Sequence, residues 1–374
     1  MKRALTSCMM SAALLAVEVL VGQGIARAQQ DNGSIVGWGW NYNGQSNVPA
    51  PNTGFVAVAA GGFHNLGLKA DGSIVAWGAN EYGDCVVPAP NNGFVAMAAG
   101  NYHSLGLKAD GSIVAWGDNY CEQCVVPGPN TKFVAVAAGT WHSLGLKADG
   151  SIVGWGQNNY GECNMPSPNM GFVAIAAGNR YSLALKGDGS IRAWGANDHA
   201  ECNVPAPNTA FVAVSAGELH SLGLKADGSI VAWGQNNYGD CVVPAPNTGF
   251  AAVSAGYLHS LGLKADGSIV AWGNNSSGQC NVPAPNTRFV AVGAGTYHSL
   301  ALVGLVSRRG DLNCDGYVNF DDINPFVKAL IGQDAYETRY PGCSWLNADI
   351  NADGYVDFDD INPFVACLVS AECP

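Results

Sequence analysis

Charged residues are scarce in this sequence, and basic residues are the scarcest. Only 12% of the 374 residues are charged, and Lys and Arg together number 17 against 29 Asp and Glu. A protein that follows a phosphate backbone needs a basic patch or stripe. The composition therefore argues against nucleic acid as a partner.

Long apolar runs are almost as rare. After residue 28 no stretch approaches the ~20 apolar residues that cross a bilayer, so we expect no membrane span. At the N-terminus, Lys2 and Arg3 precede an apolar run over residues 9–21, and Ala26-Arg27-Ala28 has the pattern of a cleavage site. This order predicts a signal peptide over residues 1–28 and a secreted, extracellular protein of bacterial type. A retained membrane anchor is the alternative, which the shortness of the run disfavours.

A 39-residue repeat fills most of the chain. It places a Trp at equal intervals from Trp38 to Trp272 and a Phe from Phe55 to Phe289. The unit reads F-V-A-V-A-A-G-x-x-H-S-L-G-L-K-A-D-G-S-I-V-A-W-G, then a variable loop and C-V-V-P-A-P-N. Four short β-prone segments separated by turns such as Asp-Gly predict an all-β, seven-bladed β-propeller over residues 29–305, with four strands per blade. A linear β-solenoid is the alternative.

The two ends of the repeat region favour a closed ring. The chain enters at the third strand of a unit, residues 34–39, and leaves after a second strand, residues 298–302. Segments from both ends can therefore complete one blade, which leaves no free sheet edge. We expect a closed propeller that is monomeric.

The segments A-G-x-x-H-S-L-x-L and D-G-S-I-V-A-W-G resemble the regulator of chromosome condensation (RCC1) repeat family. The chain looks most like a secreted bacterial branch that includes a β-lactamase-inhibitory propeller, whose blades also end in Gly-Gln-x-x-V-P. The resemblance implies a propeller fold. In the inhibitory branch it further implies that loop aromatics grip a partner protein.

Three side chains recur at fixed positions, and we interpret them as scaffold. The repeated Trp residues are expected in the core between blades, and the repeated His, replaced once by Tyr181, is expected to be buried and hydrogen-bonded rather than a metal ligand. The repeated Cys is expected to be a small unpaired side chain, because equivalent positions in neighbouring blades lie beyond disulfide reach. Cys121 and Cys124 leave a local disulfide open.

Two segments vary strongly between units: the pair before the repeated His and the loop after Trp-Gly. Strand direction places both at the same end of every blade, and aromatic residues recur there. Rigidly held, exposed aromatics are typical of a binding hot spot for a protein or a glycan. The predicted partner-binding residues are Tyr42, Phe63, Tyr82, Tyr102, Tyr120, Trp141, Tyr160, Arg180, His199, Tyr238 and Tyr297.

Motifs of common catalytic sites are missing: there is no G-x-S-x-G and no H-E-x-x-H. We therefore predict no catalytic residue and a non-catalytic binding protein. A polysaccharide-degrading enzyme, hydrolase or lyase, or an accessory subunit of one, is the alternative, because acids near the variable loops could supply a carboxylate pair. These acids are Glu81, Asp84, Glu162, Asp198, Glu201, Glu218 and Asp240.

After a linker at residues 306–310, the segment 311–374 is acidic, with 12 acids against Lys328 and Arg339. Two twelve-residue stretches carry oxygen ligands at positions 1, 3, 5 and 12, Gly at 6, and a backbone carbonyl ligand at 7, which predicts two Ca²⁺ ions. The predicted ligands are Asp311, Asn313, Asp315, Tyr317 and Asp322 in the first loop, and Asp349, Asn351, Asp353, Tyr355 and Asp360 in the second.

Duplicated loop–helix units with Asp at position 12 resemble a type I dockerin. The resemblance implies calcium-dependent attachment to a cohesin-type scaffold. The chain departs from the dockerin pattern at positions 10 and 11, which are Phe320-Asp321 and Phe358-Asp359. We expect the two helical segments to pack through Phe326, Val327, Phe364 and Val365. Four cysteines allow three disulfide connectivities, and the pairing we choose is Cys314–Cys343 with Cys367–Cys373.

Overall fold

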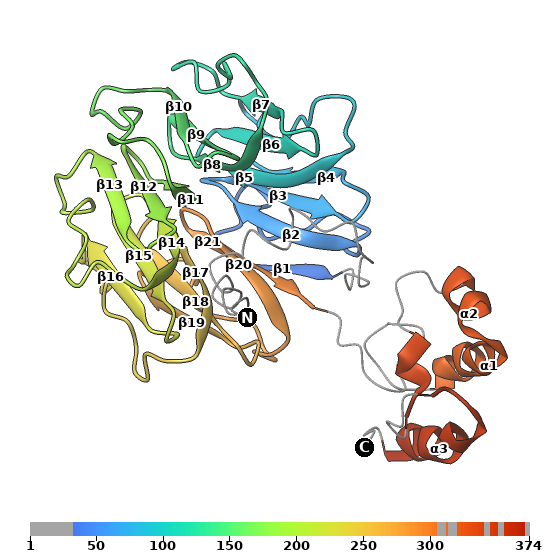
Figure 1. Ribbon diagram of the computed structural model, residues 1–374. Coiled ribbons are helices and arrows are strands. Elements are labelled where there is room, and N and C mark those ends of the chain that lie inside the picture. The colour runs from blue at the N-terminus through green and yellow to red at the C-terminus, as the bar shows by residue number, and fades with distance from the viewer. Residues whose placement is uncertain (1–32, 305–311, 313–319, 340–344, 351–354, 371–374) are drawn as a thin grey trace, which may run out of the picture. The chain divides into compact units, whose positions relative to one another are not determined.

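The computed structural model describes residues 33–304, 312, 320–339, 345–350 and 355–370. The chain divides into two compact units, a β-rich unit that holds Ile35–Leu302 and a helical unit that holds Val303–Pro374 (Figure 1). Each is described by itself. In the described part of the chain, no helix has the length and apolarity needed to cross a bilayer.

The β-rich unit consists of seven three-stranded antiparallel sheets set around one axis (Figure 1). The first strand of each repeat contacts the first strands of its neighbours and is the inner strand of its blade. The inner strands are β2 (Phe55–Ala60), β5 (Phe94–Ala99), β8 (Phe133–Ala138), β11 (Phe172–Ala177), β14 (Phe211–Ala216), β17 (Phe250–Ala255) and β20 (Phe289–Ala294).

The second strand of each repeat lies in the middle of its sheet, and the third lies outside. The middle strands are β3 (His64–Lys69), β6 (His103–Lys108), β9 (His142–Lys147), β12 (Tyr181–Lys186), β15 (His220–Lys225), β18 (His259–Lys264) and β21 (His298–Val303). The outer strands are β1 (Ser34–Gly39), β4 (Ile74–Gly78), β7 (Ile113–Gly117), β10 (Ile152–Gly156), β13 (Ile191–Gly195), β16 (Ile230–Gly234) and β19 (Ile269–Gly273).

We number the blades along the chain, from blade 1 (β2, β3, β4) to blade 6 (β17, β18, β19). Blade 7 has the order β20-β21-β1, so it combines the last two strands of the repeat region with the first. The predicted closure of the ring by both ends is therefore confirmed. The register is regular: in blade 1, His64 faces Gly78 and Leu68 faces Ile74.

The prediction of four strands per blade is wrong, because the segment Cys-Val-Val-Pro forms no strand. A side chain occupies the exposed edge of the outer strand instead. In blade 1 the Asn91 amide donates to the Ile74 carbonyl and accepts from the Ile74 N–H, both at 2.8 Å. The same pair of bonds recurs in all seven blades. Two prolines leave the segment short of ladder donors, and the amide supplies the missing partner.

The propeller core lies between blades. Leu66, Leu68 and Ile74 of blade 1 pack with Phe94 and Trp116 of blade 2 in one buried cluster. Equivalent clusters join the other blades, as expected for the repeated Trp. Each blade therefore depends on its neighbour for burial of its apolar face.

The helical unit contains α1 (Ile323–Ile331), α2 (Gln333–Arg339) and α3 (Ile361–Ser370), with 3₁₀ turns η1 (Phe320–Asp322), η2 (Trp345–Ala348) and η3 (Phe358–Asp360). Phe326 and Phe364 stack at a centroid separation of 4.2 Å, which confirms their predicted packing. Val327 and Val365 are half exposed, so their predicted packing is wrong. Successive residues on a helix point about 100° apart, and only one of each pair can face the core.

Candidate binding face

The two variable segments of each repeat meet at one end of the blade, which we call the variable end. In blade 1 the N–H of Ala79, the residue after Trp-Gly, donates to the carbonyl of Phe63, the residue before the repeated His, at 2.9 Å. All seven blades have this bond, at 2.8–2.9 Å. Because the bond uses backbone atoms only, the side chains on both sides are free to vary.

Aromatic rings make contact across blades 1 to 3 at this end. The Tyr102 ring lies 6.2 Å from the Phe63 ring and 5.0 Å from the Trp141 ring, centroid to centroid. Tyr82 packs edge-on against Tyr102 at 5.5 Å. We call Phe63, Tyr82, Tyr102 and Trp141 the aromatic cluster. Four of the predicted partner-binding residues therefore form one continuous surface.

A second group of rings lies at the variable end of blades 6 and 7. Trp40 contacts Tyr42 and Tyr297 at 6.3 and 6.2 Å, and Tyr257 packs edge-on against Tyr297 at 5.8 Å. The prediction included Tyr42 and Tyr297 but missed Trp40 and Tyr257. Trp40 stands where other repeats have small or polar residues, which was the signal available in the sequence.

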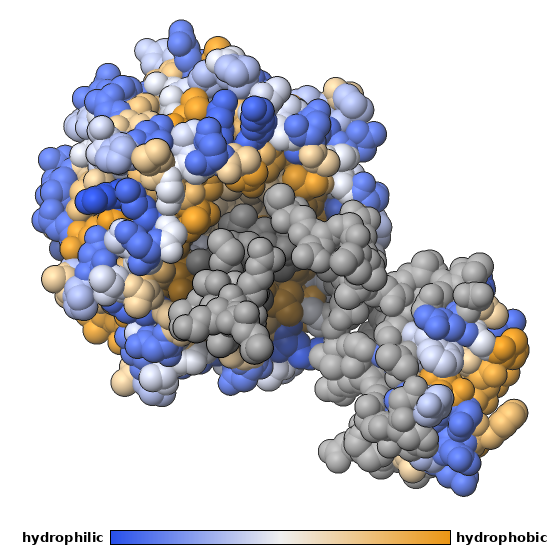
Figure 2. Space-filling model, in the orientation of Figure 1, coloured by the Kyte–Doolittle hydropathy of each residue, from blue (hydrophilic) through white to orange (hydrophobic). Residues whose placement is uncertain are grey.

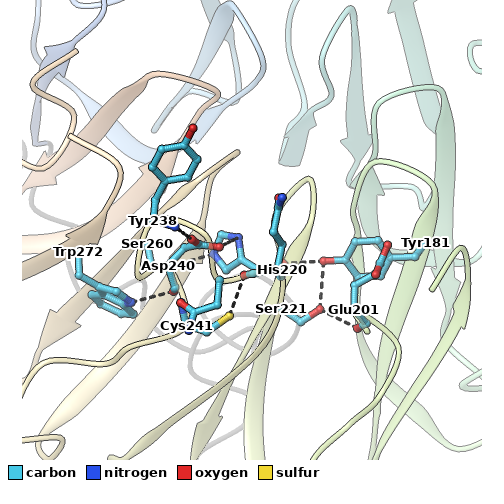
Figure 3. Close-up of polar contacts among 11 residues, drawn as sticks. Tyr181, Glu201, His220, Ser221, Tyr238, Asp240, Cys241, Ser260 and Trp272 are labelled. Carbon is cyan, nitrogen blue, oxygen red and sulfur yellow. Dashed lines mark hydrogen bonds and ion pairs between the residues drawn. The ribbon is translucent and has the colours of Figure 1, made fainter. Parts of the chain in front are cut away.

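The other predicted residues lie at the same end without joining either group. Arg180 donates to the Tyr160 hydroxyl at 2.9 Å and lies over its ring. Tyr120 is 89% exposed, and His199 and Tyr238 are also exposed. Figure 3 shows the Tyr238 ring pointing away from the buried contacts beneath it.

Four of the seven acids proposed for a carboxylate pair occupy the same position in their loops. Asp84, Glu162, Glu201 and Asp240 are buried, and each accepts a backbone N–H of its own loop, such as the Tyr160 N–H on Glu162 at 2.8 Å. Gln45, Gln123 and Gln279 make the same bond in the remaining blades. Because an amide serves equally well, this position shapes the loop.

The repeated His residues form a closed chain of hydrogen bonds between blades, as expected of scaffold residues. His64 Nε2 lies 2.8 Å from Ser104 Oγ of the next blade, and His298 Nε2 lies 2.6 Å from Asn65 Oδ1, which closes the ring. Ser104 Oγ and Trp116 Nε1 both donate to the Asp84 carbonyl. Figure 3 shows the same network where blades 4, 5 and 6 meet.

Burial lowers the pKa of these histidines far below 6.5. The pKa is about 4 for His64, His142 and His220, and about 3 for His103, His259 and His298, where neighbouring histidines contribute a smaller lowering. They are therefore neutral at physiological pH. The repeated Cys residues are unpaired, as expected, and each thiol donates to the backbone carbonyl six residues earlier. Cys121 and Cys124 are also free thiols.

The first residue of the variable pair lines the propeller axis in five of the seven blades, and of these five only Glu218 was named from the sequence. The turns that carry these residues pack tightly, since a Cβ at Gly100 would lie 2.4 Å from the Gly139 carbonyl oxygen. The axial side chains include Asn101, Thr140, Glu218, Tyr257 and Thr296.

Part of the predicted calcium site lies within the described residues. Asp322 and Asp360 are buried, and each accepts the backbone N–H of the second residue of its loop, Leu312 at 2.6 Å and Ile350 at 2.7 Å. Asp349 is buried, and Tyr355 is exposed. The other six predicted ligands lie outside the described residues: Asp311, Asn313, Asp315, Tyr317, Asn351 and Asp353.

The predicted disulfides are only partly within the described residues. Cys367 is buried in the helical unit and is disulfide-bonded. Cys314, Cys343 and Cys373 lie outside the described residues, so the pairing stays a prediction.

The chain forms a closed repeat propeller whose blades share the same strands and differ in two loop segments at one end. The model of the regulator of chromosome condensation (RCC1) repeat matches residues 55–84, 94–123, 133–162, 172–201, 211–240 and 250–279. The unit is therefore an RCC1-like repeat β-propeller. No curated protein matches the chain.

Solved structures share this fold at low sequence identity. Prp20p from Saccharomyces cerevisiae aligns with a TM-score of 0.65 at 18% identity, over 80% of this chain and 97% of that chain. Human WBSCR16 aligns with a TM-score of 0.59 at 16% identity, over 73% of this chain and 99% of that chain. The CRINKLY WD40 ectodomain of the Arabidopsis thaliana receptor kinase ACR4 aligns with a TM-score of 0.55 at 24% identity, over 68% of this chain and 93% of that chain.

Proposed function

We propose that the chain is an exported, non-catalytic binding protein whose propeller holds a protein partner on its variable end. The observation that carries this proposal is the aromatic cluster, which runs without interruption across three blades. Aromatic side chains offer large contact areas and lose little conformational entropy when a partner binds. The backbone bond beneath each variable pair keeps these rings in place before binding.

The relatives support a protein as the partner. The printed description of Prp20p reports its binding properties to Gsp1p and histones, and another structure shows Kap60 bound to yeast RCC1. Their identity to this chain is 18%, so the partner itself does not carry over. The likeness to the secreted inhibitory branch favours an extracellular enzyme as the partner.

The test uses the full chain as bait for extracellular proteins and, separately, on a glycan array. A face variant, Tyr102→Ala with Trp141→Ala, is compared with wild type and with Lys108→Met at the opposite end of the blades. We expect a protein retained by wild type and Lys108→Met and lost by the face variant. A glycan with the same dependence would replace protein by glycan, and a partner indifferent to the face variant would contradict the proposal.

We also propose that the helical unit is a calcium-dependent attachment module for a cohesin-type scaffold. Its support is the matched closure of the two loops by Asp322 and Asp360, because carboxylates at loop ends are the hard oxygen donors that Ca²⁺ prefers. Bound Ca²⁺ would neutralise the crowded carboxylates. Two apolar stripes of equal spacing are exposed, Phe320-Ile323-Val327 and Phe358-Ile361-Val365, and Figure 2 shows hydrophobic side chains at the surface of this unit.

Chelation tests the calcium proposal. Without the cation, repulsion among the acids should unfold residues 311–374 and leave the propeller folded. Asp315→Ala with Asp353→Ala should reproduce the chelated state. Hydrogen exchange on the intact protein, with and without chelator, measures both units at once. Equal protection of the helical unit in both conditions would contradict calcium binding.

A further inference from the structure

The propeller axis carries a small cavity at the variable end. Its volume is about 70 Å³, and the Ala-Gly ends of all seven inner strands surround it. The side chains of Asn101, Thr140, Glu218, Tyr257 and Thr296 complete the wall. A cavity of this size holds a few water molecules or the head group of a single side chain.

Glu218 provides the only charge in this wall, and its carboxylate is held near the axis. It belongs to blade 5, yet its Oε1 accepts from Asn101 Nδ2 of blade 2 and from Thr296 Oγ1 of blade 7, both at 3.1 Å. Among the described residues, no Lys, Arg or His lies within 4 Å of the carboxylate, and no residue donates a hydrogen bond to its Oε2. Two donors therefore fix the group, and the described part of the chain supplies no counter-ion for its charge.

Tyr257 lines the axial cavity together with Glu218. Burial raises the pKa of Tyr102, Tyr257 and Tyr297, and the nearby charge of Glu218 raises it further. Burial also raises the pKa of Glu218 itself, while the bonds from Asn101 and Thr296 act in the opposite direction. Aromatic faces carry partial negative charge, so a ring beside a carboxylate forms an environment suited to a cation.

The neighbouring surface has the same sign of charge. A hollow of about 260 Å³ next to the axis is lined by Phe63, Tyr82, Tyr102 and Glu81, and it shares Asn101 with the axial cavity. Exposed loops at the variable end add Asp118, Glu122 and Asp198, whereas Arg180 is the only Lys or Arg in the described variable segments. Such a field attracts a basic group toward the axis.

We propose that the axial cavity binds the ammonium or guanidinium group of a Lys or Arg side chain of the protein partner, with Glu218 as counter-ion and Tyr257 as part of the wall. This inference rests on the proposed function, since it specifies what the partner inserts. Charged pairs desolvated at the centre of an interface form its strongest contacts when their hydrogen bonds are complete. The aromatic cluster would then hold the apolar surroundings of that basic side chain.

The cavity is tested without the partner, by titrating the full calcium-loaded chain with N-acetylarginine amide and with its neutral analogue N-acetylcitrulline amide. Tyrosine NMR signals report binding. We expect millimolar affinity for the arginine probe, at least tenfold tighter than for citrulline, and at least tenfold weaker binding to Glu218→Gln. Asp198→Asn removes one exposed acid from the same end and should change affinity less than twofold.

Equal affinity for the two probes, or unchanged binding by a folded Glu218→Gln, would overturn the inference. If Glu218→Gln fails to fold, Tyr257→Leu is the second variant, and its affinity for the arginine probe should fall at least threefold. Unchanged probe affinity in Tyr257→Leu would also overturn it. Partner binding separates the two proposals. Loss with Tyr102→Ala and Trp141→Ala but not with Glu218→Gln leaves the proposed function intact and overturns the axial site.

Discussion

The two ends of each blade share the same three strands but are held together differently. At the end opposite the variable segments, which we call the constant end, side chains contact each other within one blade: Ser112 donates to Asp110, and the Lys108 ammonium lies 3.6 Å from the centre of the Phe94 ring. At the variable end, hydrogen bonds run between blades: His64 Nε2 bonds to Ser104 Oγ, and Trp116 Nε1 donates to the Asp84 carbonyl. The bond beneath each variable pair uses backbone atoms only, so the variable end can change its partner without changing the fold.

The largest effect is expected from acid, which protonates the buried histidines of the middle strands and so destabilises the whole propeller. The folded pKa values of the six histidines, about 3 to 4, lie below the unfolded value of 6.5. Between these values the unfolded chain binds more protons, so stability is full above pH 6.5 and falls as the pH drops toward 4. Each histidine contributes about 1.4 kcal/mol per pH unit in that window.

Six histidines acting together should remove on the order of 10 kcal/mol of stability between pH 7 and pH 5. The raised pKa values of Asp84 and Asp240, next to His64 and His220, offset part of this loss. Denaturant unfolding followed by Trp fluorescence measures it, because nine of the ten tryptophans belong to the propeller repeats. An unfolding midpoint that does not move between pH 7 and pH 5 would show that the histidines are hydrated or charged in the folded state.

The next largest effect is expected from Trp155→Ala, which removes a buried side chain between blades 2 and 3. Trp155 is buried with Phe133 and Leu105, and its Nε1 donates to the Gln123 carbonyl at 2.8 Å. The cavity left by the indole should lower the free energy of unfolding by about 3–5 kcal/mol. Thermal unfolding gives the value. A loss below about 1 kcal/mol would mean that the blades do not depend on this contact.

Trp141→Ala and Tyr102→Ala sharpen the comparison, because both change the variable end alone. Each should weaken partner binding by about 1–3 kcal/mol. Each should lower stability by no more than about 1.5 kcal/mol, the range for the aromatic pairs that are lost. Isothermal titration and thermal unfolding of the same samples provide the two numbers. Equal losses in both would place these rings in the structural core.

The smallest effect is expected at the constant end. Lys108→Met removes a cation over the Phe94 ring and its bonds to backbone carbonyls, and should lower stability by about 1 kcal/mol or less. Partner affinity should not change, because this lysine lies at the end of the blade away from the variable segments. Any loss of affinity in this variant would show that the partner also reaches the constant end.

The sequence alone predicted the frame because the repeat presents the same evidence seven times. Equal spacing of Trp, Phe and Asp-Gly indicated the propeller, its closure by both chain ends, and the meeting of the variable segments at one end. The duplicated acidic loops likewise indicated two related units in the tail, and Phe326 and Phe364 do stack. These are local or periodic properties, which a sequence displays directly.

Only the tertiary structure decided which groups from different blades meet. The predicted fourth strand is replaced by an Asn amide. In blade 1 the Asn91 amide bonds to both the N–H and the carbonyl of Ile74, 17 residues earlier, on the edge where the fourth strand was expected. Glu218 counted as one loose acid among seven, yet it bonds to Asn101, 117 residues distant, and to Thr296, 78 residues distant. Such contacts depend on how the ring closes in space, and no local pattern in the chain records that distance.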